Sequence, residues 1–176
     1  MTGADIARRA RIKSSRLKVP CKKFSGAMAT ELLRQALTDM GLTTSARDVF
    51  VQGVPQEIDL IIPHQDEQPA LGLMYKPYQV AVALEIKKKG IFGEQSLQKI
   101  RNNFNHLHDL GIACAYVTLE ERTTYRYRAT KDNLGFPCFT LAWYSRENGP
   151  IEDRGEWDKL LAFIHERLLG QRGIAD

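Results

Sequence analysis

The sequence predicts a mixed α/β fold, with a central mixed sheet flanked by helices, on three observations. The first is a three-to-four spacing of apolar residues, typical of amphipathic helices, over residues 28–40, 94–110 and 155–169. The second is a set of short apolar runs typical of strands, at residues 49–51, 57–62, 80–87 and 112–119. The third is their order, which implies a sheet covered by helices. No internal repeat or linker divides the 176 residues, so we expect a basic N-terminal arm at 1–24 and a single domain at 25–176.

Local signals justify the first half of this order. Ser25 and Gly26 precede the first helix, and Gly41 is a good terminator for it. Gly53-Val54-Pro55 is expected to form the turn that leads into the second strand. Residues 63–78 contain three prolines and several polar residues, which favours a loop or a hairpin excursion.

The second half of the chain is less regular. Residues 90–93 begin and end with glycine and should interrupt the chain before the second helix, which Gly111 ends. The apolar run at 112–119 is typical of a buried strand. Beyond it, residues 122–128 could form a hairpin arm and residues 139–144 a further strand.

Composition limits the classes of function. The 43% hydrophobic and 26% charged content is ordinary for a globular protein, and no stretch approaches a membrane span or the apolar segment of a secretory signal. Cys21, Cys114 and Cys138 form no zinc pattern, which favours free thiols in a reducing cytoplasm, and Cys114 lies in an apolar run typical of the core. No glycine-rich phosphate-binding motif is present, so use of nucleoside triphosphates is unsupported.

The positive charge is concentrated at the N-terminus. Residues 1–23 carry eight Lys or Arg and one acid, a net charge of +7 within an overall +4, so the remaining residues sum to −3. Such an arm suits contact with a polyanion, where each neutralised phosphate releases counterions. A disordered, solubilising tail would have the same composition, so the arm alone does not identify nucleic acid as a partner.

The most informative residues are two acids and a lysine within apolar, strand-like runs. Asp59 lies in the run at 57–62, and Glu85 and Lys87 lie in the run at 80–87. Residues two apart on a strand share a face, so Glu85 and Lys87 should project together. If the two strands are neighbours, the Asp59 carboxylate can meet Glu85 across the ladder. These charges need partners, because a lone buried charge strongly destabilises the fold.

A divalent cation would balance the two carboxylates. Together with the backbone carbonyl of Ile86, Asp59 and Glu85 would give Mg²⁺ (or Mn²⁺) its usual few protein ligands. A metal held there can polarise a phosphate and lower the pKa of a bound water, while Lys87 orients that water and stabilises the transition state. This combination indicates metal-dependent hydrolysis of phosphodiester bonds. Glu85 and Lys87 could instead be a solvated pair at a strand end, but Asp59 would then still lack a partner.

The order Glu31, Asp59 and Glu85-Ile86-Lys87, on a helix and two strands, resembles the PD-(D/E)XK nuclease superfamily, also called restriction-endonuclease-like. The resemblance covers residues 25–119 and implies the αβββαβ core of that group. Ile58 stands where the family name has a proline, a residue that many members lack.

Within the superfamily, the chain is closest in look to the small, archaeal Holliday-junction resolvases. Those proteins have a glycine and a glutamate opening the first helix, which ends at a glycine. Gly26, Glu31 and Gly41 match this pattern.

The resemblance implies a role for each matching residue. Asp59 and Glu85 would bind the metal, Lys87 would serve catalysis, and Glu31 would support a metal through water. Glu31 also has a simpler explanation, because an acid in the first turn of a helix is favoured by the helix dipole.

The resemblance also implies the reaction, a DNA endonuclease that leaves a 5′-phosphate and a 3′-hydroxyl. Gln95 or Gln98, near the start of the second helix, would match a glutamine that some branches place beside the site. A homodimer would supply two symmetry-related sites for two strands. The alternative is a catalytically inactive nucleic-acid-binding module of the same fold, and a third reading is an interaction protein without a nucleic-acid role.

Further basic residues are candidates for contact with nucleic acid. They come from the arm, from the end of the Glu85 strand and from a segment that alternates cations with aromatics: Arg8, Arg9, Arg11, Lys13, Lys22, Lys23, Lys88, Lys89, Arg122, Arg126 and Arg128. In that last segment the arginines would share one face of a strand, and Tyr125 and Tyr127 would share the other, where they could stack on bases. An ordinary edge hairpin explains the segment equally well.

Overall fold

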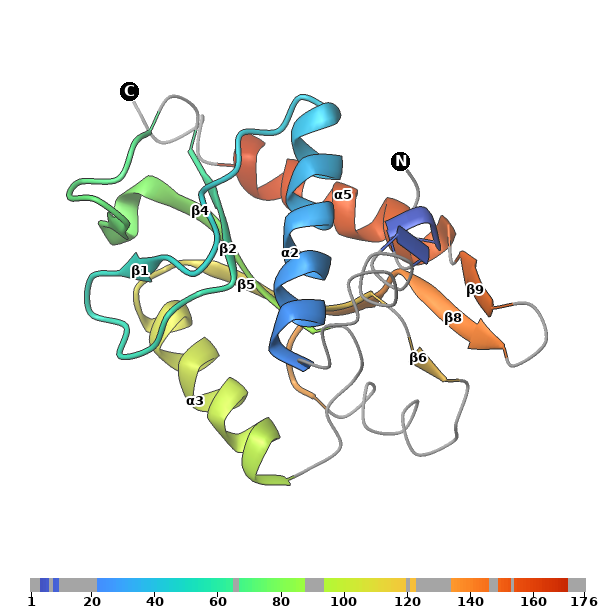
Figure 1. Ribbon diagram of the computed structural model, residues 1–176. Helices are drawn as coiled ribbons and strands as arrows, with labels where there is room; N and C mark the ends of the chain where they lie inside the picture. The colour runs from blue at the N-terminus through green and yellow to red at the C-terminus, as the bar shows by residue number, and fades with distance from the viewer. Residues whose placement is uncertain are drawn as a thin grey trace.

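The computed structural model describes residues 4–6, 8–9, 22–64, 67–87, 94–119, 121–122, 134–145, 149–152 and 154–170. Within this part of the chain, a four-stranded sheet lies between long helices (Figure 1). The sheet has the order β2 (Leu60–Pro63), β4 (Val80–Lys87), β5 (Ala113–Thr118) and β7 (Cys138–Thr140). The helices are α2 (Lys22–Asp39), α3 (Glu94–Asp109) and α5 (Arg154–Leu169).

The central sheet is mixed. β4 runs antiparallel to β2 and parallel to β5, and β5 is in turn parallel to β7. β4 and β5 are joined through α3, as a parallel pair requires a crossover connection. The predicted class, a mixed α/β fold with a central mixed sheet and flanking helices, is confirmed.

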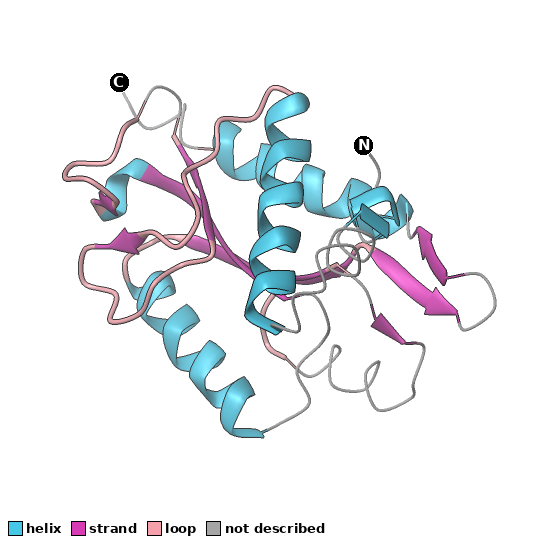
Figure 2. Cartoon of the chain, viewed as in Figure 1, coloured by secondary structure: helices cyan, strands magenta, loops and turns pink. Residues whose placement is uncertain are grey.

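The two faces of the sheet pack against different helices (Figure 2). One face is apolar throughout and packs against α2 and α5, with Leu84 and Val117 fully buried in its core. The other face packs against α3, where Ile61 and Ala83 meet Phe104. Because side chains alternate along a strand, Glu85 and Lys87 lie on the α3 face together with Ala83.

Two smaller sheets lie beside the central one. The first pairs β1 (Phe50–Val51) with β3 (Met74–Tyr75), followed by a short 3₁₀ helix, η1 (Pro77–Gln79). The second contains β6 (Glu121–Arg122), β8 (Ala142–Ser145) and β9 (Gly149–Glu152). The single strand predicted at 139–144 is therefore two strands in different sheets, β7 and β8, with Leu141 between them.

The first helix begins earlier than the sequence signals predicted. α2 starts at Lys22, so the domain boundary expected after residue 24 falls inside this helix. Farther back, Ile6 is fully buried in the core that faces α2 and α5. An apolar side chain can dock a basic segment onto the core, which a count of charges does not detect. At the other end, Gly41 follows the helix with φ +85°, a backbone conformation that glycine adopts without strain.

Asp59 lies just before its strand, not within it. β2 begins at Leu60, and Asp59 occupies a bend between that strand and an isolated bridge from Ile58 to Val49. The bend places the aspartate at the end of the sheet.

None of the helices in the described ranges combines the length and the apolar character that a membrane span requires.

We expect Leu84→Ala to lower the free energy of unfolding by about 2–5 kcal/mol, because it leaves a cavity where β4 packs against the helices. Leu71→Ala is the matched control: Leu71 is 78% exposed, whereas Leu84 is 0% exposed. The control should change the free energy by less than about 0.5 kcal/mol. Urea unfolding followed by circular dichroism measures both, and equal losses in the two variants would contradict this packing.

Burial raises the pKa of the Cys114 thiol to about 12. The thiolate is the reactive form, so we expect slow alkylation of the folded protein by iodoacetamide at pH 8 and a rate that rises about tenfold per pH unit. In a variant with Cys21→Ser and Cys138→Ser, Cys114 is the remaining cysteine. Mass spectrometry then measures the rate at which Cys114 is alkylated. The same variant in urea should react at the rate of a free cysteine. If the folded and unfolded rates are alike at pH 8, Cys114 is more accessible than the structure shows.

Candidate functional site

Two strands of the central sheet bring the predicted acids together. β2 pairs with β4 so that Leu60 lies opposite Leu84. Continuing this antiparallel register by one residue places Asp59 beside Glu85. Both then lie on the face of the sheet that α3 covers.

Asp59, Glu85 and Lys87, here called the acid–lysine triad, are joined through their side chains. The Nζ of Lys87 donates to Oδ2 of Asp59 at 3.1 Å and pairs with Oε1 of Glu85 at 2.5 Å. The backbone N–H of Ile86 donates to the same Asp59 oxygen at 2.6 Å, which fixes this carboxylate against the neighbouring strand. The three side chains are only 20%, 16% and 32% exposed, in the order Asp59, Glu85 and Lys87.

The triad is electrostatically coupled. Burial raises the pKa of Glu85, the nearby Asp59 carboxylate raises it further, and the Lys87 ammonium only partly opposes them. Burial acts to lower the pKa of Lys87, but the two carboxylates outweigh it and leave that pKa above its ordinary value. Lys87 therefore keeps its proton. Its ammonium is a counter-ion of the two acids.

The triad borders a small cleft of about 210 Å³ beside α3. The cleft is lined from the segment before β2, from β4 and from α3, by Gln56, Glu85, Lys87, Ser96, Lys99, Ile100, Asn103 and Phe104. At about 30 Å³ per water molecule, this space admits a phosphate group with a few waters. It is too small to enclose a nucleotide chain.

The donor set fits a hard divalent cation. Asp59 and Glu85 supply two carboxylates, and among the residues that the structure describes, no three His, Cys, Asp or Glu side chains gather to hold a metal. Zinc sites generally use three or four such ligands. Mg²⁺ is commonly held by one or two carboxylates, with waters and substrate phosphates completing its shell. The residues present thus fit Mg²⁺ or Mn²⁺ bound together with a phosphodiester.

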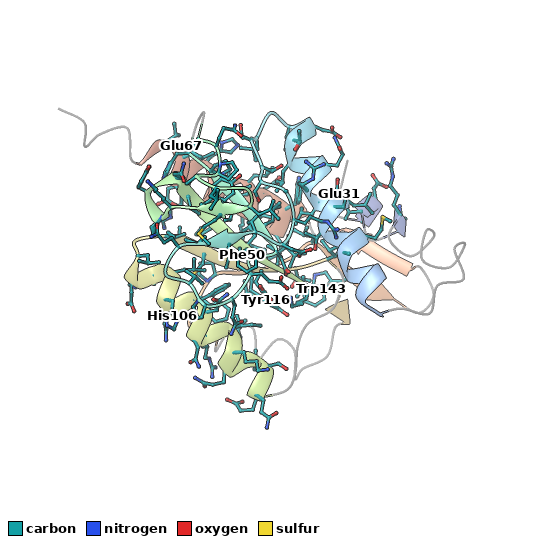
Figure 3. All side chains as sticks on the ribbon, turned by 60° about the vertical axis from the view of Figure 1, so that its left-hand side comes forward. Glu31, Phe50, Glu67, His106, Tyr116 and Trp143 are labelled. Atoms are coloured by element: carbon teal, nitrogen blue, oxygen red, sulfur yellow. The ribbon has the colours of Figure 1, made fainter. Side chains whose placement is uncertain are left out.

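Glu31 projects from α2, and its contacts are to arginines (Figure 3). Arg34 donates to its two carboxylate oxygens at 2.9 and 2.6 Å, and Arg47 lies 3.9 Å away. The hydrogen bonds from Arg34 hold the pKa of Glu31 below its usual value, although burial partly opposes them. Within the described residues, no contact joins Glu31 to the acid–lysine triad. Its support of a metal through water stays a prediction.

The glutamines expected beside the site lie elsewhere on α3. Gln95 and Gln98 are exposed, and Gln98 donates to Asn102 at 2.9 Å on the helix surface. Successive residues of a helix are rotated by about 100°, so these glutamines fall outside the stripe that faces the sheet. Lys99 and Asn103 line the cleft instead.

Asn103 is a site residue that the sequence interpretation missed. It is 4% exposed, and it interrupts a buried stripe of α3 that is otherwise apolar, formed by Leu97, Ile100, Phe104 and Leu107. A buried polar side chain normally has a hydrogen-bond partner, so an asparagine in an apolar stripe was the signal that could have found it.

Five of the basic residues predicted to contact nucleic acid are within the described part of the chain. Arg8 and Arg9 are helical and exposed, and Arg8 lies 3.9 Å from Asp5. Lys22 and Lys23 open α2, and Arg122 belongs to β6. The others lie outside the described residues, as do Tyr125 and Tyr127: Arg11, Lys13, Lys88, Lys89, Arg126 and Arg128.

Comparison with known proteins finds similarity in structure. No family model and no curated protein matches the chain. NucC of P. aeruginosa ATCC27853, in its cAAA-bound form, superposes with a TM-score of 0.63 at 11% identity, over 93% of this chain and 89% of that chain. NucC of E. coli MS115-1, also in a cAAA-bound form, gives a TM-score of 0.62 at 10% identity, over 93% of this chain and 88% of that chain.

NucC is a nuclease with the restriction-endonuclease-like, or PD-(D/E)XK, fold. The predicted closeness to Holliday-junction resolvases is not supported by these matches. At such low identity the similarity concerns the fold alone. The chain therefore has the restriction-endonuclease-like fold that its sequence predicted.

Proposed function

We propose that this chain is a metal-dependent nuclease that hydrolyses phosphodiester bonds and cuts DNA internally. The observation that carries the proposal is the acid–lysine triad, in which one ammonium joins two carboxylates at the end of the central sheet. The fold supports the proposal but would not suffice, because one fold hosts many functions. The triad adds the chemical groups that phosphodiester hydrolysis requires.

Each residue of the triad has its own proposed role. Asp59 and Glu85 hold the divalent cation, and the Ile86 N–H keeps the Asp59 carboxylate oriented. A bound Mg²⁺ would supply Lewis-acid polarisation of the phosphate and a water of lowered pKa. Lys87 holds its proton beside the phosphate, where it orients the attacking water and offsets the developing negative charge.

The cleft suggests how the substrate is bound. Lys99 adds a second cation, on the wall formed by α3, to the cleft that Lys87 lines. A scissile phosphate can enter this space, and the rest of the strand must lie along the outer surface because the cleft is small. The basic N-terminal residues are the proposed contacts for that strand, since phosphate contacts fix the position of a protein on DNA.

Asp59→Ala, Glu85→Ala and Lys87→Ala should each lower the rate of plasmid cleavage in Mg²⁺ by at least about 100-fold, because groups that act as a unit lose function together. Lys159→Ala is the control. This exposed lysine on α5 pairs only with nearby Glu156 among the described residues, so its loss should leave the rate unchanged. Gel assays on plasmid, branched and single-stranded DNA measure the rates, and EDTA should stop the reaction. Salt-sensitive DNA binding without metal-dependent cutting would favour the inactive binding module.

Metal binding should also be visible without a substrate. At about 100 times the dissociation constant, a ligand adds about 2.7 kcal/mol to the stability of the folded state. For a chain of this size, that is a rise in Tm of about 5–10 °C. Scanning fluorimetry with Mn²⁺ should show the rise in the native chain and lose it in the Asp59→Asn, Glu85→Gln double variant. An equal rise in both proteins would place the metal elsewhere.

A further inference from the structure

Asn103 carries a buried acceptor that the fold leaves unused. The residue is 4% exposed, and its Oδ1 is inaccessible to solvent and has no hydrogen-bond partner among the residues that the structure describes. Buried polar atoms are rarely left in this state, because they lose their bonds to water and gain nothing in return. An apolar residue of similar size would stabilise this position better.

The position of Asn103 relates it to the triad. It lines the same cleft as Glu85 and Lys87, on the opposite wall, which α3 forms. One turn earlier on α3, Lys99 lines the cleft as well. The residue that carries the buried acceptor thus lies in the wall of the cleft, between the lining residues Lys99 and Phe104.

Lys87 would lose its hydrogen-bond acceptors if a divalent cation bound to the two carboxylates. Its ammonium is held by Oδ2 of Asp59 and Oε1 of Glu85, the carboxylates that the proposed function assigns to the metal. A dication next to those carboxylates repels the ammonium and competes for both of its acceptors. The side chain is two-thirds buried, so a displaced ammonium would be stabilised by an acceptor on the wall of the cleft.

We propose that Oδ1 of Asn103 accepts a hydrogen bond from Lys87 Nζ when a divalent cation occupies the Asp59 and Glu85 carboxylates. Asn103 is then the positioning residue for Lys87. The four-carbon stem of lysine allows the ammonium to turn from the strands toward the helix within the cleft. Held there, the ammonium keeps two further N–H donors for the phosphate and the attacking water. This inference rests on the proposed function and adds to it the residue that places the catalytic lysine.

The proposed hydrogen bond predicts opposite effects of Asn103 on stability in the absence and in the presence of a divalent cation. In the absence of a divalent cation the acceptor has no partner among the described residues and destabilises the fold. In the metal-bound state it receives Lys87 and stabilises that arrangement. Replacing Asn103 with leucine, which has nearly the same shape and no acceptor, should therefore favour the first state and weaken the second.

The experiment compares Asn103→Leu with Asn105→Leu, the same substitution at an exposed position of α3. Asn103→Leu should raise the Tm of the metal-free protein by about 2–4 °C. The Mn²⁺ concentration that gives half of the thermal shift should rise by about tenfold. At saturating metal, kcat should fall by about 10–100-fold, as it does when a residue that orients a metal site is lost. Asn105→Leu should change none of these values.

A double-mutant cycle tests whether Asn103 acts through the lysine. In a Lys87→Met background, Asn103→Leu should leave the half-saturating Mn²⁺ concentration unchanged within about twofold, because the partner is already absent. A tenfold effect in both backgrounds would overturn the proposal. So would a fall in the metal-free Tm of Asn103→Leu, which is the result expected of a purely structural asparagine.

The outcomes separate this inference from the function on which it rests. If the native chain shows neither a Mn²⁺-induced thermal shift nor metal-dependent cleavage, the proposed function fails and the inference fails with it. If the native chain shows both and Asn103→Leu matches it in metal titration and kcat, the role of Asn103 alone is refuted.

Discussion

The site depends on one electrostatic constraint: two largely buried carboxylates, one in the bend before β2 and one on β4, require a cation between them. Lys87 meets this requirement in the metal-free protein by bonding to Asp59 and to Glu85. The same constraint ties the fold to the site. A slip of one residue in the pairing of β2 with β4 would turn one carboxylate to the opposite, apolar face of the sheet. The register that packs the core is therefore also the register that assembles the triad.

Stability and chemistry are divided between the two faces of the sheet. The face under α2 and α5 is apolar throughout and supplies most of the buried side chains. The face under α3 is largely apolar, around Ile100, Phe104 and Leu107. Polar side chains interrupt this face at Lys99 and Asn103, which border a cleft. Because the face under α2 and α5 contributes no side chain to the acid–lysine triad, the polar end of the other face can carry groups that weaken packing.

The sequence predicted the helices and strands whose apolar pattern repeats over many residues. It missed the elements that are too short to show such a pattern. The helix and strand that flank the site, α3 and β4, were predicted to within one residue because their apolar residues recur over many positions. The pairing of β1 with β3 was not predicted, since two-residue strands carry no periodic signal. The role expected for Gln95 or Gln98 beside the site stays a prediction. Their assignment followed a family pattern, whereas the phase of α3 turns Gln98 outward and Asn103 inward.

Polar residues in buried positions indicate the function of a protein better than its fold does. The chain shares the architecture of NucC at 10–11% identity, which is possible because packing requires only apolar side chains of suitable size in the right pattern. Asp59, Glu85 and Asn103 do not serve that pattern. Each is a polar group in a largely buried position where a hydrocarbon would be more stable, and Glu85 and Asn103 line the same cleft. In a protein whose stability margin is small, such residues must have another use. The energetic cost of the three groups is the physical reason to assign chemistry to this end of the sheet.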